Sequence, residues 1–256
     1  MPVVVKYGGN AMTDDGTRAA VAAEIRALFE AGSSPVVVHG GGPFISEALD
    51  AAGLPHRFER GLRVTSPASL EVIERVLTVL SKRLAQDVGP ALGLSGRDAR
   101  LLLADVLDPA LGRVGRVTGV NADALGSLLA AGFVPVLACL ATDAQGGLLN
   151  VNADEVAGAV AGALGAGAVF LTNVPGVMDD PARPDSVLAM LSRPEAEARI
   201  RDGRIAGGMI PKVEAALRAL ELGAPYAIIA DGRRPASARD ALRGEGGTRL
   251  ADVVTR

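Results

Sequence analysis

Residues that build disulfide frameworks and protein-held metal centres are almost absent from this sequence. Its 256 residues include one cysteine, Cys139, and two histidines, His39 and His56. A single thiol cannot form an internal disulfide, and this set is too small for a structural zinc site. Cys139 lies in the apolar run VPVLACLA, so we predict a buried structural thiol. We predict no metal site built from protein side chains.

Aromatic residues and excess positive charge are also scarce. Aromatic residues make up 3% of the chain, tryptophan is absent, and the formal net charge is −3. A nucleic-acid-binding surface usually needs a basic field, often with aromatic stacking platforms. We therefore predict no nucleic-acid partner, and a core in which helices and sheet pack closely through small side chains.

Neither a leader nor a membrane-spanning segment is visible. The opening MPVVVKYGG has no basic stretch followed by a long apolar core. No uninterrupted apolar run reaches the roughly 20 residues that a bilayer requires. We expect a soluble, cytoplasmic protein with no membrane partner.

What the sequence does contain is an alternation of short apolar runs and longer helical patterns. The strand-like runs lie at residues 3–5, within 34–42, and at 133–141, 167–173 and 226–232. Helical spacing occurs at residues 17–32, 43–53, 69–89, 154–167 and 210–223. Apolar strands separated by helices predict an α/β fold with a parallel sheet covered on both faces. Residues 99–121, with glycines and short valine runs, predict a hairpin-like excursion.

The pattern predicts two lobes that share one sheet. An alanine- and glycine-rich helix gives way to VFLTNVPGVMDD near residues 165–170. No low-complexity linker separates the halves. We therefore place an N-terminal lobe at residues 1–168 and a C-terminal lobe at residues 169–256, in one continuous fold.

Two strands each run into glycines. The first ends in KYGG, from Lys6 to Gly9, and the second in HGGGP, from His39 to Pro43. Glycine lets backbone N–H groups approach an anion closely, and a following helix N-terminus adds partial positive charge. Taken alone, KYGG is more typical of a tight turn with a surface lysine. Together, the two loops at the carboxyl edge of a parallel sheet favour an anion site.

Polar residues follow in two further motifs. GLRVT contains Arg63, which can grip a carboxylate with two parallel hydrogen bonds or can simply lie on the surface. LLNVNADEVA carries Asn150, Asn152 and Asp154, which face one side if the segment is extended. Asp154 also stands where a helix begins, so it could cap that helix.

A second lysine follows glycines near the start of a helix. Lys212 lies just after Gly207 and Gly208 in GGMIPKV. Two lysines from opposite ends of the chain, with glycine loops and one aspartate, suit phosphoryl transfer. That reaction depends on alignment and charge stabilisation more than on covalent catalysis.

Six motifs occur in a characteristic order: KYGGNAM, VVVHGGGPFI, GLRVT, LLNVNADEVA, LTNVPGVMDD and GGMIPKV. They span residues 5 to about 213, and ADGR at residues 230–233 extends the likeness. In this set the sequence resembles the amino acid kinase family, and within it the enzymes that phosphorylate N-acetyl-L-glutamate. The resemblance implies a three-layer αβα sandwich with a central, mainly parallel eight-stranded sheet. It also implies transfer of phosphate from ATP with Mg²⁺ to the side-chain carboxylate, giving N-acetyl-L-glutamyl 5-phosphate in arginine biosynthesis.

The resemblance also implies catalytic roles. Lys6 and Lys212 would stabilise the transferring phosphoryl group, and Asp154 would hold both lysines in place. Backbone N–H groups would bind the phosphoryl group at four glycines: Gly8, Gly9, Gly41 and Gly42.

Substrate and nucleotide would bind in different lobes. The N-terminal lobe would bind the amino-acid substrate through Arg63, Asn150, Asn152, Gly41 and Gly42, with Arg63 on the α-carboxylate. The C-terminal lobe would bind ATP through Thr172, Asn173, Val177, Met178, Gly207, Met209 and Lys212. No protein side chain is expected to ligate the metal, because Mg²⁺ bridges phosphate oxygens and keeps several waters.

Alternatives remain open at this stage. A related kinase phosphorylates carrier-protein-linked α-aminoadipate or glutamate, and a sensor could keep the fold without catalysis. A nicotinamide dehydrogenase is disfavoured, because HGGGPF lacks the G-x-G-x-x-G spacing. Relatives inhibited by arginine carry an extra N-terminal helix, whereas the first strand here begins at about residue 3. The resemblance therefore favours a homodimer, formed through the N-terminal lobe, over a ring-like hexamer inhibited by arginine.

Overall fold

The computed structural model describes residues 1–8, 15–180, 183, 186–234 and 236–252. Gly9, one of the predicted phosphoryl-binding glycines, lies outside the described residues. In the described part of the chain no helix is both long and apolar enough to cross a membrane.

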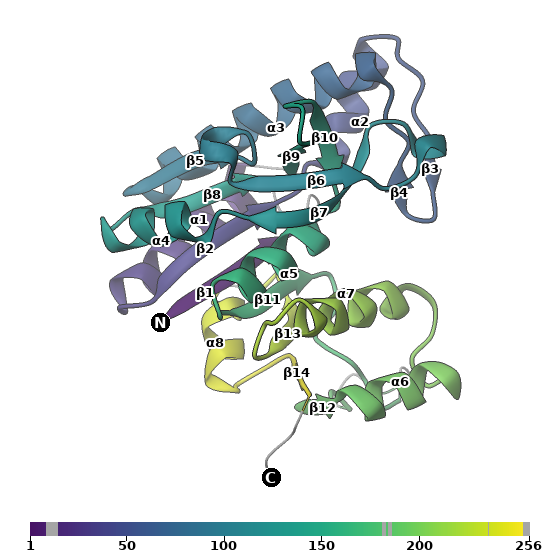
Figure 1. The fold of residues 1–256 in the computed structure, drawn as a ribbon. Helices are drawn as coiled ribbons and strands as arrows, with labels where there is room; N and C mark the ends of the chain where they lie inside the picture. The colour runs from purple at the N-terminus through teal and green to yellow at the C-terminus, as the bar shows by residue number, and fades with distance from the viewer. Residues whose placement is uncertain (9–14, 181–182, 184–185, 235, 253–256) are drawn as a thin grey trace.

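An eight-stranded sheet forms the centre of the molecule (Figure 1). From one edge to the other its strands are β12 (Met190–Ser192), β14 (Thr248–Ala251), β13 (Ala227–Asp231), β11 (Gly167–Thr172), β1 (Pro2–Tyr7), β2 (Ser34–His39), β8 (Val134–Ala138) and β5 (Ala91–Ser95). Every neighbouring pair is parallel except β13 and β14. The prediction of a mainly parallel eight-stranded sheet is confirmed.

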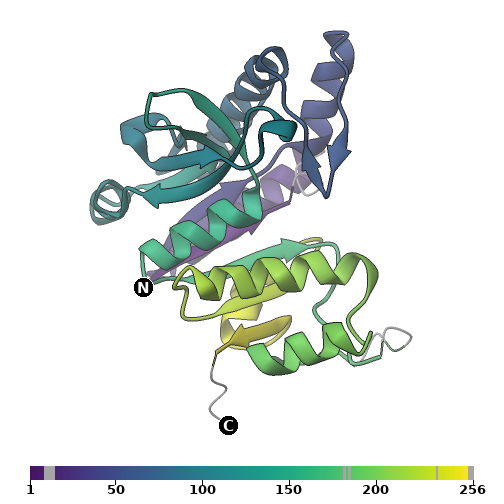
Figure 2. The same cartoon turned by 45° about the vertical axis from the view of Figure 1, so that its right-hand side comes forward.

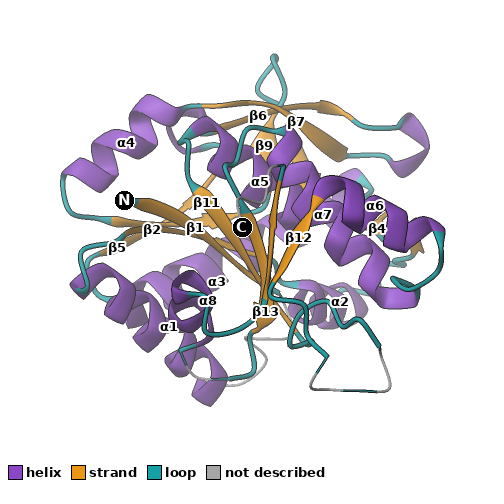
Figure 3. Cartoon of the chain, turned by 90° about the horizontal axis from the view of Figure 1, so that it is seen from below, coloured by secondary structure: helices purple, strands orange, loops and turns teal. Residues whose placement is uncertain are grey.

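Helices cover both faces of this sheet, which gives three layers (Figure 3). One face packs against α1 (Asp15–Glu30), α3 (Pro67–Val88) and α8 (Ser237–Arg243). The other packs against α4 (Ala122–Ala130), α5 (Ala153–Ala163) and α7 (Ile210–Glu221), with α6 (Arg193–Arg201) at the edge beside β12. Helix α2 (Gly42–Ala51) packs on α3. Alternating residues of β1 divide between the two faces, since Val4 joins one apolar cluster and Val5 the other.

A second, smaller sheet lies above the main one in the view of Figure 1. Strands β6 (Leu102–Val106), β7 (Val114–Val120), β9 (Leu140–Thr142) and β10 (Leu148–Val151) close on themselves. β6 and β7 are antiparallel, so the predicted hairpin-like excursion is present. A separate two-stranded hairpin joins β3 (Phe58–Glu59) to β4 (Leu62–Arg63). Single 3₁₀ turns occur at η2 (Asp98–Arg100), η3 (Pro109–Leu111) and η4 (Gly207–Met209).

Helices α5 and α7 lie side by side in unusually close contact (Figure 2). A Cβ atom on Gly158 would come within 3.0 Å of the Ala219 Cα atom, and one on Gly162 within 1.8 Å of the Leu222 carbonyl oxygen. Because later residues of α5 meet later residues of α7, the two helices run in the same direction. Their N-termini, which carry Asp154 and Lys212, therefore lie at the same end of the pair.

The chain departs from the sequence predictions at several element boundaries. The apolar run at residues 133–141 divides into β8 and β9, so Cys139 lies between two strands of different sheets. The helix predicted to reach residue 167 ends at Ala163. The division between residues 168 and 169 falls inside β11, which pairs with β1 on one side and β13 on the other. The two lobes therefore share one sheet, and their separate roles stay a prediction.

Candidate active site

The carboxyl end of β1 presents a lysine to the start of α5. Lys6 shares the sheet face of Val4, and its Nζ atom lies 2.7 Å from Asp154 Oδ1. The two side chains are 13% and 35% exposed, so the ammonium is largely withdrawn from water. An ammonium group has three donors and can bind an anion while keeping this ion pair. The structure brings together Lys6 and Asp154, as the sequence predicted.

Asn152, not Asp154, caps helix α5. Its Oδ1 atom accepts from the backbone N–H groups of Asp154, at 2.7 Å, and Glu155, at 3.4 Å. The alternative interpretation of Asp154 as the cap is therefore wrong. Since Asn152 satisfies the helix terminus, the Asp154 carboxylate is left to pair with Lys6.

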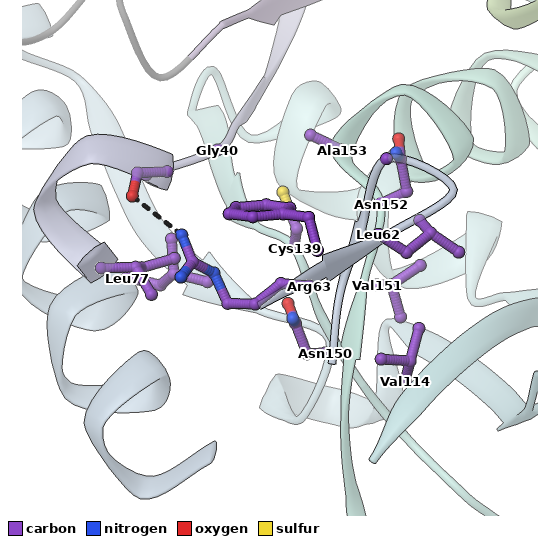
Figure 4. Close-up of a pocket in the computed structure, with 15 residues that line it drawn as sticks. Gly40, Leu62, Arg63, Leu77, Val114, Cys139, Asn150, Val151, Asn152 and Ala153 are labelled. Atoms are coloured by element: carbon purple, nitrogen blue, oxygen red, sulfur yellow. Dashed lines mark hydrogen bonds between the residues drawn. The ribbon is translucent and has the colours of Figure 1, made fainter. Parts of the chain in front are cut away.

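A pocket of about 180 Å³ lies next to this ion pair, between α2, the β3–β4 hairpin and β10 (Figure 4). Its lining consists of Gly40, Gly41, Gly42, Ile45, Phe58, Gly61, Leu62, Arg63, Leu77, Val114, Cys139, Asn150, Val151, Asn152 and Ala153. Lys6 and Asp154 do not line the pocket themselves. They lie near it, because Asn152 and Ala153 immediately precede Asp154 and both charges act on the lining residue Cys139. Apolar walls with a few polar groups are typical of a small-molecule site.

Arg63 is the cation of this pocket. It is 7% exposed, and its Nη2 atom donates to the Gly42 carbonyl at 3.1 Å and to Ser46 Oγ at 2.9 Å. Figure 4 shows the first of these bonds as a dashed line. The guanidinium stacks 4.5 Å from the centre of the Phe58 ring, and burial lowers the pKa of Arg63 from its ordinary value. Its Nη1 atom is buried without a hydrogen-bond partner, so Arg63 has donors left for a ligand.

Asn150 is fixed by a residue of the Arg63 segment. Its Nδ2 atom donates to Thr65 Oγ1 at 3.2 Å, and Thr65 Oγ1 donates to the Arg63 carbonyl at 2.8 Å. Because the hydroxyl proton is committed to that carbonyl, the hydroxyl can only accept from the amide. This contact assigns the nitrogen of Asn150 toward Thr65 and leaves its carbonyl oxygen for other partners.

The glycine loop between β2 and α2 forms another wall. Gly41 precedes α2, and no side chain caps the helix there. A Cβ on Gly41 would lie 2.9 Å from Leu77 Cδ2 and 3.0 Å from Leu80 Cδ1, so a larger residue would require these two side chains of α3 to shift. A Cβ on Gly8 would lie 3.9 Å from Lys6 Nζ. The carboxyl ends of β1 and β2 thus bring together Gly8, Gly41 and Gly42. Their predicted role in binding the phosphoryl group stays a prediction.

Lys212 lies in the first turn of α7, away from the Lys6 ion pair. Its Nζ atom donates to the Gly208 carbonyl at 3.0 Å, in an exposed position. Among the residues that the structure describes, no ion pair joins Lys212 to Asp154. The parallel packing of α5 and α7 nevertheless puts both residues at the same end of the helix pair. The predicted convergence of the two lysines therefore stays a prediction.

The other predicted nucleotide-binding residues lie in two segments. Thr172 ends β11, and its hydroxyl accepts from the Val174 N–H at 3.2 Å. Asn173 is exposed and Met178 half-buried. Val177 is 1% exposed, and both its backbone groups are engaged, the N–H by Thr248 Oγ1 and the carbonyl by the Leu188 N–H. Val177 therefore supports the loop and has no free group for a nucleotide.

Gly207 and Met209 belong to the η4 turn that leads into α7. Gly207 has φ +55°, a backbone conformation that glycine adopts readily. No side chain caps α7, but the Ile210 N–H donates to the Gly207 carbonyl and Pro211 has no N–H, so the first turn offers no row of free N–H groups. The Lys212 ammonium in this turn is the group that can bind a phosphate.

The buried side chains of Cys139 and His39, near the pocket, are not suited to act as a general base. Burial raises the pKa of the Cys139 thiol to about 12 and lowers the pKa of His39 to about 4. Both are therefore neutral near pH 7. Within the described ranges no group of three or more histidine, cysteine or acidic residues could hold a metal ion.

Three residues of the site were missed by sequence reasoning. Thr65 was part of GLRVT, but only Arg63 was singled out. Ser46 stands one helical turn after Gly42, a spacing that could have placed it on the same face. Phe58, which is 58% exposed, stands in the polar segment HRFERG, and an aromatic residue in such a segment was the available signal.

Comparisons with known proteins agree on one family. The model of the amino acid kinase family matches residues 1–231. A Deinococcus radiodurans protein named acetylglutamate kinase is 57% identical over 249 residues, covering 97% of this chain and 99% of that protein. A Thermus thermophilus protein of the same name is 53% identical over 217 residues, covering 83% and 86%. A solved N-acetylglutamate synthase of Neisseria gonorrhoeae, complexed with coenzyme A and N-acetyl-glutamate, is 26% identical with a TM-score of 0.83, covering 99% of this chain and 60% of that one.

Proposed function

The chain belongs to the amino acid kinase family, and we propose that it transfers the γ-phosphoryl group of ATP to the side-chain carboxylate of N-acetyl-L-glutamate. The product is N-acetyl-L-glutamyl 5-phosphate, an intermediate of arginine biosynthesis. The observation that carries the proposal is the placement of Lys6. Its ammonium group is paired with Asp154 near a pocket that contains a buried arginine with unused donors.

The reaction needs charge stabilisation but no general base. A side-chain carboxylate is already ionised at pH 7, so one of its oxygens can attack the γ-phosphorus directly. The bond from the γ-phosphorus to the β–γ bridging oxygen breaks, and ADP leaves with that electron pair. Negative charge moves between two anions, and Lys6 stabilises it from the amino-acid side. The neutral His39 and Cys139 are consistent with this division of labour.

The pocket suits an acylated amino acid. Arg63 binds the α-carboxylate through its unpaired Nη1 donors, and the free carbonyl oxygen of Asn150 accepts from the amide N–H. A free α-ammonium would bring three donors and a positive charge toward Arg63. Apolar residues, such as Leu62 and Val114, contact the acetyl and methylene groups. The same pocket is also lined by Gly41, Gly42 and Asn152.

ATP binds at the carboxyl ends of the parallel strands, on the side of α7. Lys212 holds its phosphates, and the residues around the nucleotide are Thr172, Asn173, Met178, Gly207 and Met209. Lys212 turns from the Gly208 carbonyl to the phosphoryl group when ATP is bound. The described residues offer no acidic cluster for a metal. We propose that Mg²⁺ would arrive with ATP and would neutralise phosphate charge during the transfer.

We also propose that residues 1–168 serve the amino-acid substrate and dimerisation, that residues 169–256 serve ATP, and that the enzyme is a cytoplasmic homodimer. These proposals rest on the family resemblance. Light scattering of the purified chain tests the dimer, and a monomeric mass would contradict it.

A substrate panel tests the proposed reaction. ATP and Mg²⁺ are supplied with N-acetylglutamate, glutamate, aspartate or α-aminoadipate derivatives, and hydroxylamine traps any acyl phosphate as a hydroxamate. The proposal expects hydroxamate and ADP chiefly with N-acetylglutamate. Turnover only with a carrier-linked acid would favour the carrier-dependent kinase. ATP binding without turnover on any acid would favour a sensor.

A further inference from the structure

His39 is a fully buried polar side chain that the proposed reaction does not use. It ends β2, directly before the glycine loop, and is 0% exposed. Val36 and Val38 of the same strand belong to the apolar cluster of α5 and α7, whereas Val37 belongs to that of α1 and α3. Since side chains alternate along a strand, His39 lies on the α1–α3 face, opposite Lys6.

One nitrogen of the ring has a clear task. His39 Nδ1 lies 3.0 Å from the carbonyl oxygen of Gly40. A carbonyl only accepts, so Nδ1 carries the proton. The other nitrogen, Nε2, is buried without a partner. Leucine could fill the same space without burying an unpaired polar atom, so the ring's distinctive contribution is its hydrogen bond to Gly40.

This hydrogen bond sets the direction of the next backbone N–H group. The described residues contain no cis peptide, and in a trans peptide the N–H points away from the C=O. With the Gly40 carbonyl drawn toward the α1–α3 face, the N–H of Gly41 points toward the opposite face, which carries Lys6. Gly40 and Gly41 both line the pocket, and the Gly41 N–H has no hydrogen-bond partner in the described part of the chain.

The preceding peptide is held as well. Cys139 donates its thiol proton to the carbonyl of His39. Consecutive carbonyls, those of His39 and Gly40, are thus fixed by two buried side chains. Three successive glycines would otherwise leave this loop free to rotate its peptides, and a donor that must reorient stabilises a transition state less well.

We propose that His39 is a positioning residue, which aims the Gly41 N–H at the transferring phosphoryl group by anchoring the Gly40 carbonyl. The proposal rests on the proposed function for the identity of the anion. The orientation of the Gly41 peptide does not depend on it. His39 acts through the backbone and touches neither substrate.

Two amide replacements separate this role from simple space filling. In His39→Asn the side-chain NH₂ takes the position of Nδ1, whereas in His39→Gln it reaches the position of Nε2. We expect His39→Asn to keep most of the kcat. His39→Gln should lower kcat by about 10²-fold, the typical cost of losing one preorganised donor, with little change in the KM for N-acetylglutamate. Equal kcat values in the two variants, or a more active His39→Gln, would overturn the proposal.

A measurement without turnover keeps the proposal separate from the reaction. In ¹H–¹⁵N spectra the Gly41 amide resonance should stay near its wild-type position in His39→Asn and move in His39→Gln. An unmoved resonance in His39→Gln would overturn the positioning role even in an active enzyme. Absence of wild-type turnover on N-acetylglutamate would instead contradict the proposed function alone. Should neither variant fold, imidazole ¹⁵N spectra of the wild type decide, because protonated Nε2 and bare Nδ1 would exclude the hydrogen bond to Gly40.

Discussion

Replacing Arg63 by lysine keeps the positive charge but removes the geometry of the guanidinium. The Nη2 atom holds the Gly42 carbonyl and Ser46, the planar group stacks on Phe58, and the buried Nη1 is left for a ligand. A lysine has one nitrogen and cannot fill these positions together. Arg63→Lys should therefore weaken binding of the amino acid and leave the chemical step almost intact.

The expected size follows from the contact that is lost. A hydrogen bond to a charged group contributes roughly 1.5–3 kcal/mol, and each 1.4 kcal/mol corresponds to about a tenfold change in affinity. The KM for N-acetylglutamate should thus rise by about 10- to 100-fold, while kcat falls by less than about threefold. The KM for ATP should not change, because Arg63 lies on the amino-acid side of the site.

Steady-state ADP release at varied N-acetylglutamate and varied ATP measures all three constants. Arg57→Lys is the matched control. Arg57 precedes the same hairpin and pairs with Glu59 at 3.6 Å, but its side chain is 69% exposed. This control should behave as the wild type. A similar KM increase in Arg57→Lys, or an Arg63→Lys effect confined to ATP, would refute the assignment.

Three further outcomes are expected. Lys212→Ala should lower kcat by about 10²- to 10³-fold and change the KM for N-acetylglutamate little, because the negative charge that Lys212 stabilises develops during phosphoryl transfer. An unchanged kcat would show that Lys212 takes no part in the chemical step. Thr65→Val should raise the KM for N-acetylglutamate about tenfold, because the Asn150 amide loses the hydroxyl that orients it. Thr65→Ser keeps that hydroxyl and should restore the KM. Equal KM values in the two variants would show that the hydroxyl does not orient Asn150. Burial lowers the pKa of His39 to about 4 from 6.5, so the unfolded chain binds the extra proton between these values. The free energy of unfolding should therefore fall, by up to about 3 kcal/mol, as pH drops from 6.5 toward 4. Urea titrations should show a shallower loss in His39→Asn, and parallel losses would be inconsistent with a neutral buried ring.

The sequence predicted the central strands because each is an unbroken apolar run. β1, β2, β11 and β13 lie within 1–3 residues of the predicted bounds, and their order along the chain implied a parallel sheet. β5, with the sequence ALGLS, was missed, since Gly93 interrupts its apolar pattern. Glycine is needed at position 93 because a Cβ atom there would clash with the backbone of α3. This contact joins two distant segments of the chain, so the local sequence does not reveal it.

The antiparallel strand β14 was also beyond the sequence pattern. Its residues TRLA are too short and too polar to predict a strand, and its direction is set by pairing with β13. Helices α4, α6 and α8 were not predicted either. α6 has an apolar content too low for a periodic stripe, and its capping box of Ser192 and Glu195 was the usable signal.

Within the site, charge pairing was predictable and orientation was not. Glycine–lysine motifs pointed to Lys6 and Asp154, whose contact is present. Asn152 caps α5 because β10 ends at Val151, before the alternation of Asn150, Asn152 and Asp154 is complete. The tasks of Thr65 and His39 depend on which way a peptide or an amide faces, and residue type alone does not encode that direction.

A ternary complex tests the central claim most directly. Crystals grown with ADP, Mg²⁺, a metal fluoride and N-acetylglutamate would hold a mimic of the phosphoryl group between donor and acceptor. The account predicts Lys6 Nζ and Lys212 Nζ both within hydrogen-bond distance of that mimic, with Asp154 between them. A mimic bound with Lys212 still on the Gly208 carbonyl, or with the acceptor carboxylate away from Lys6, would contradict it.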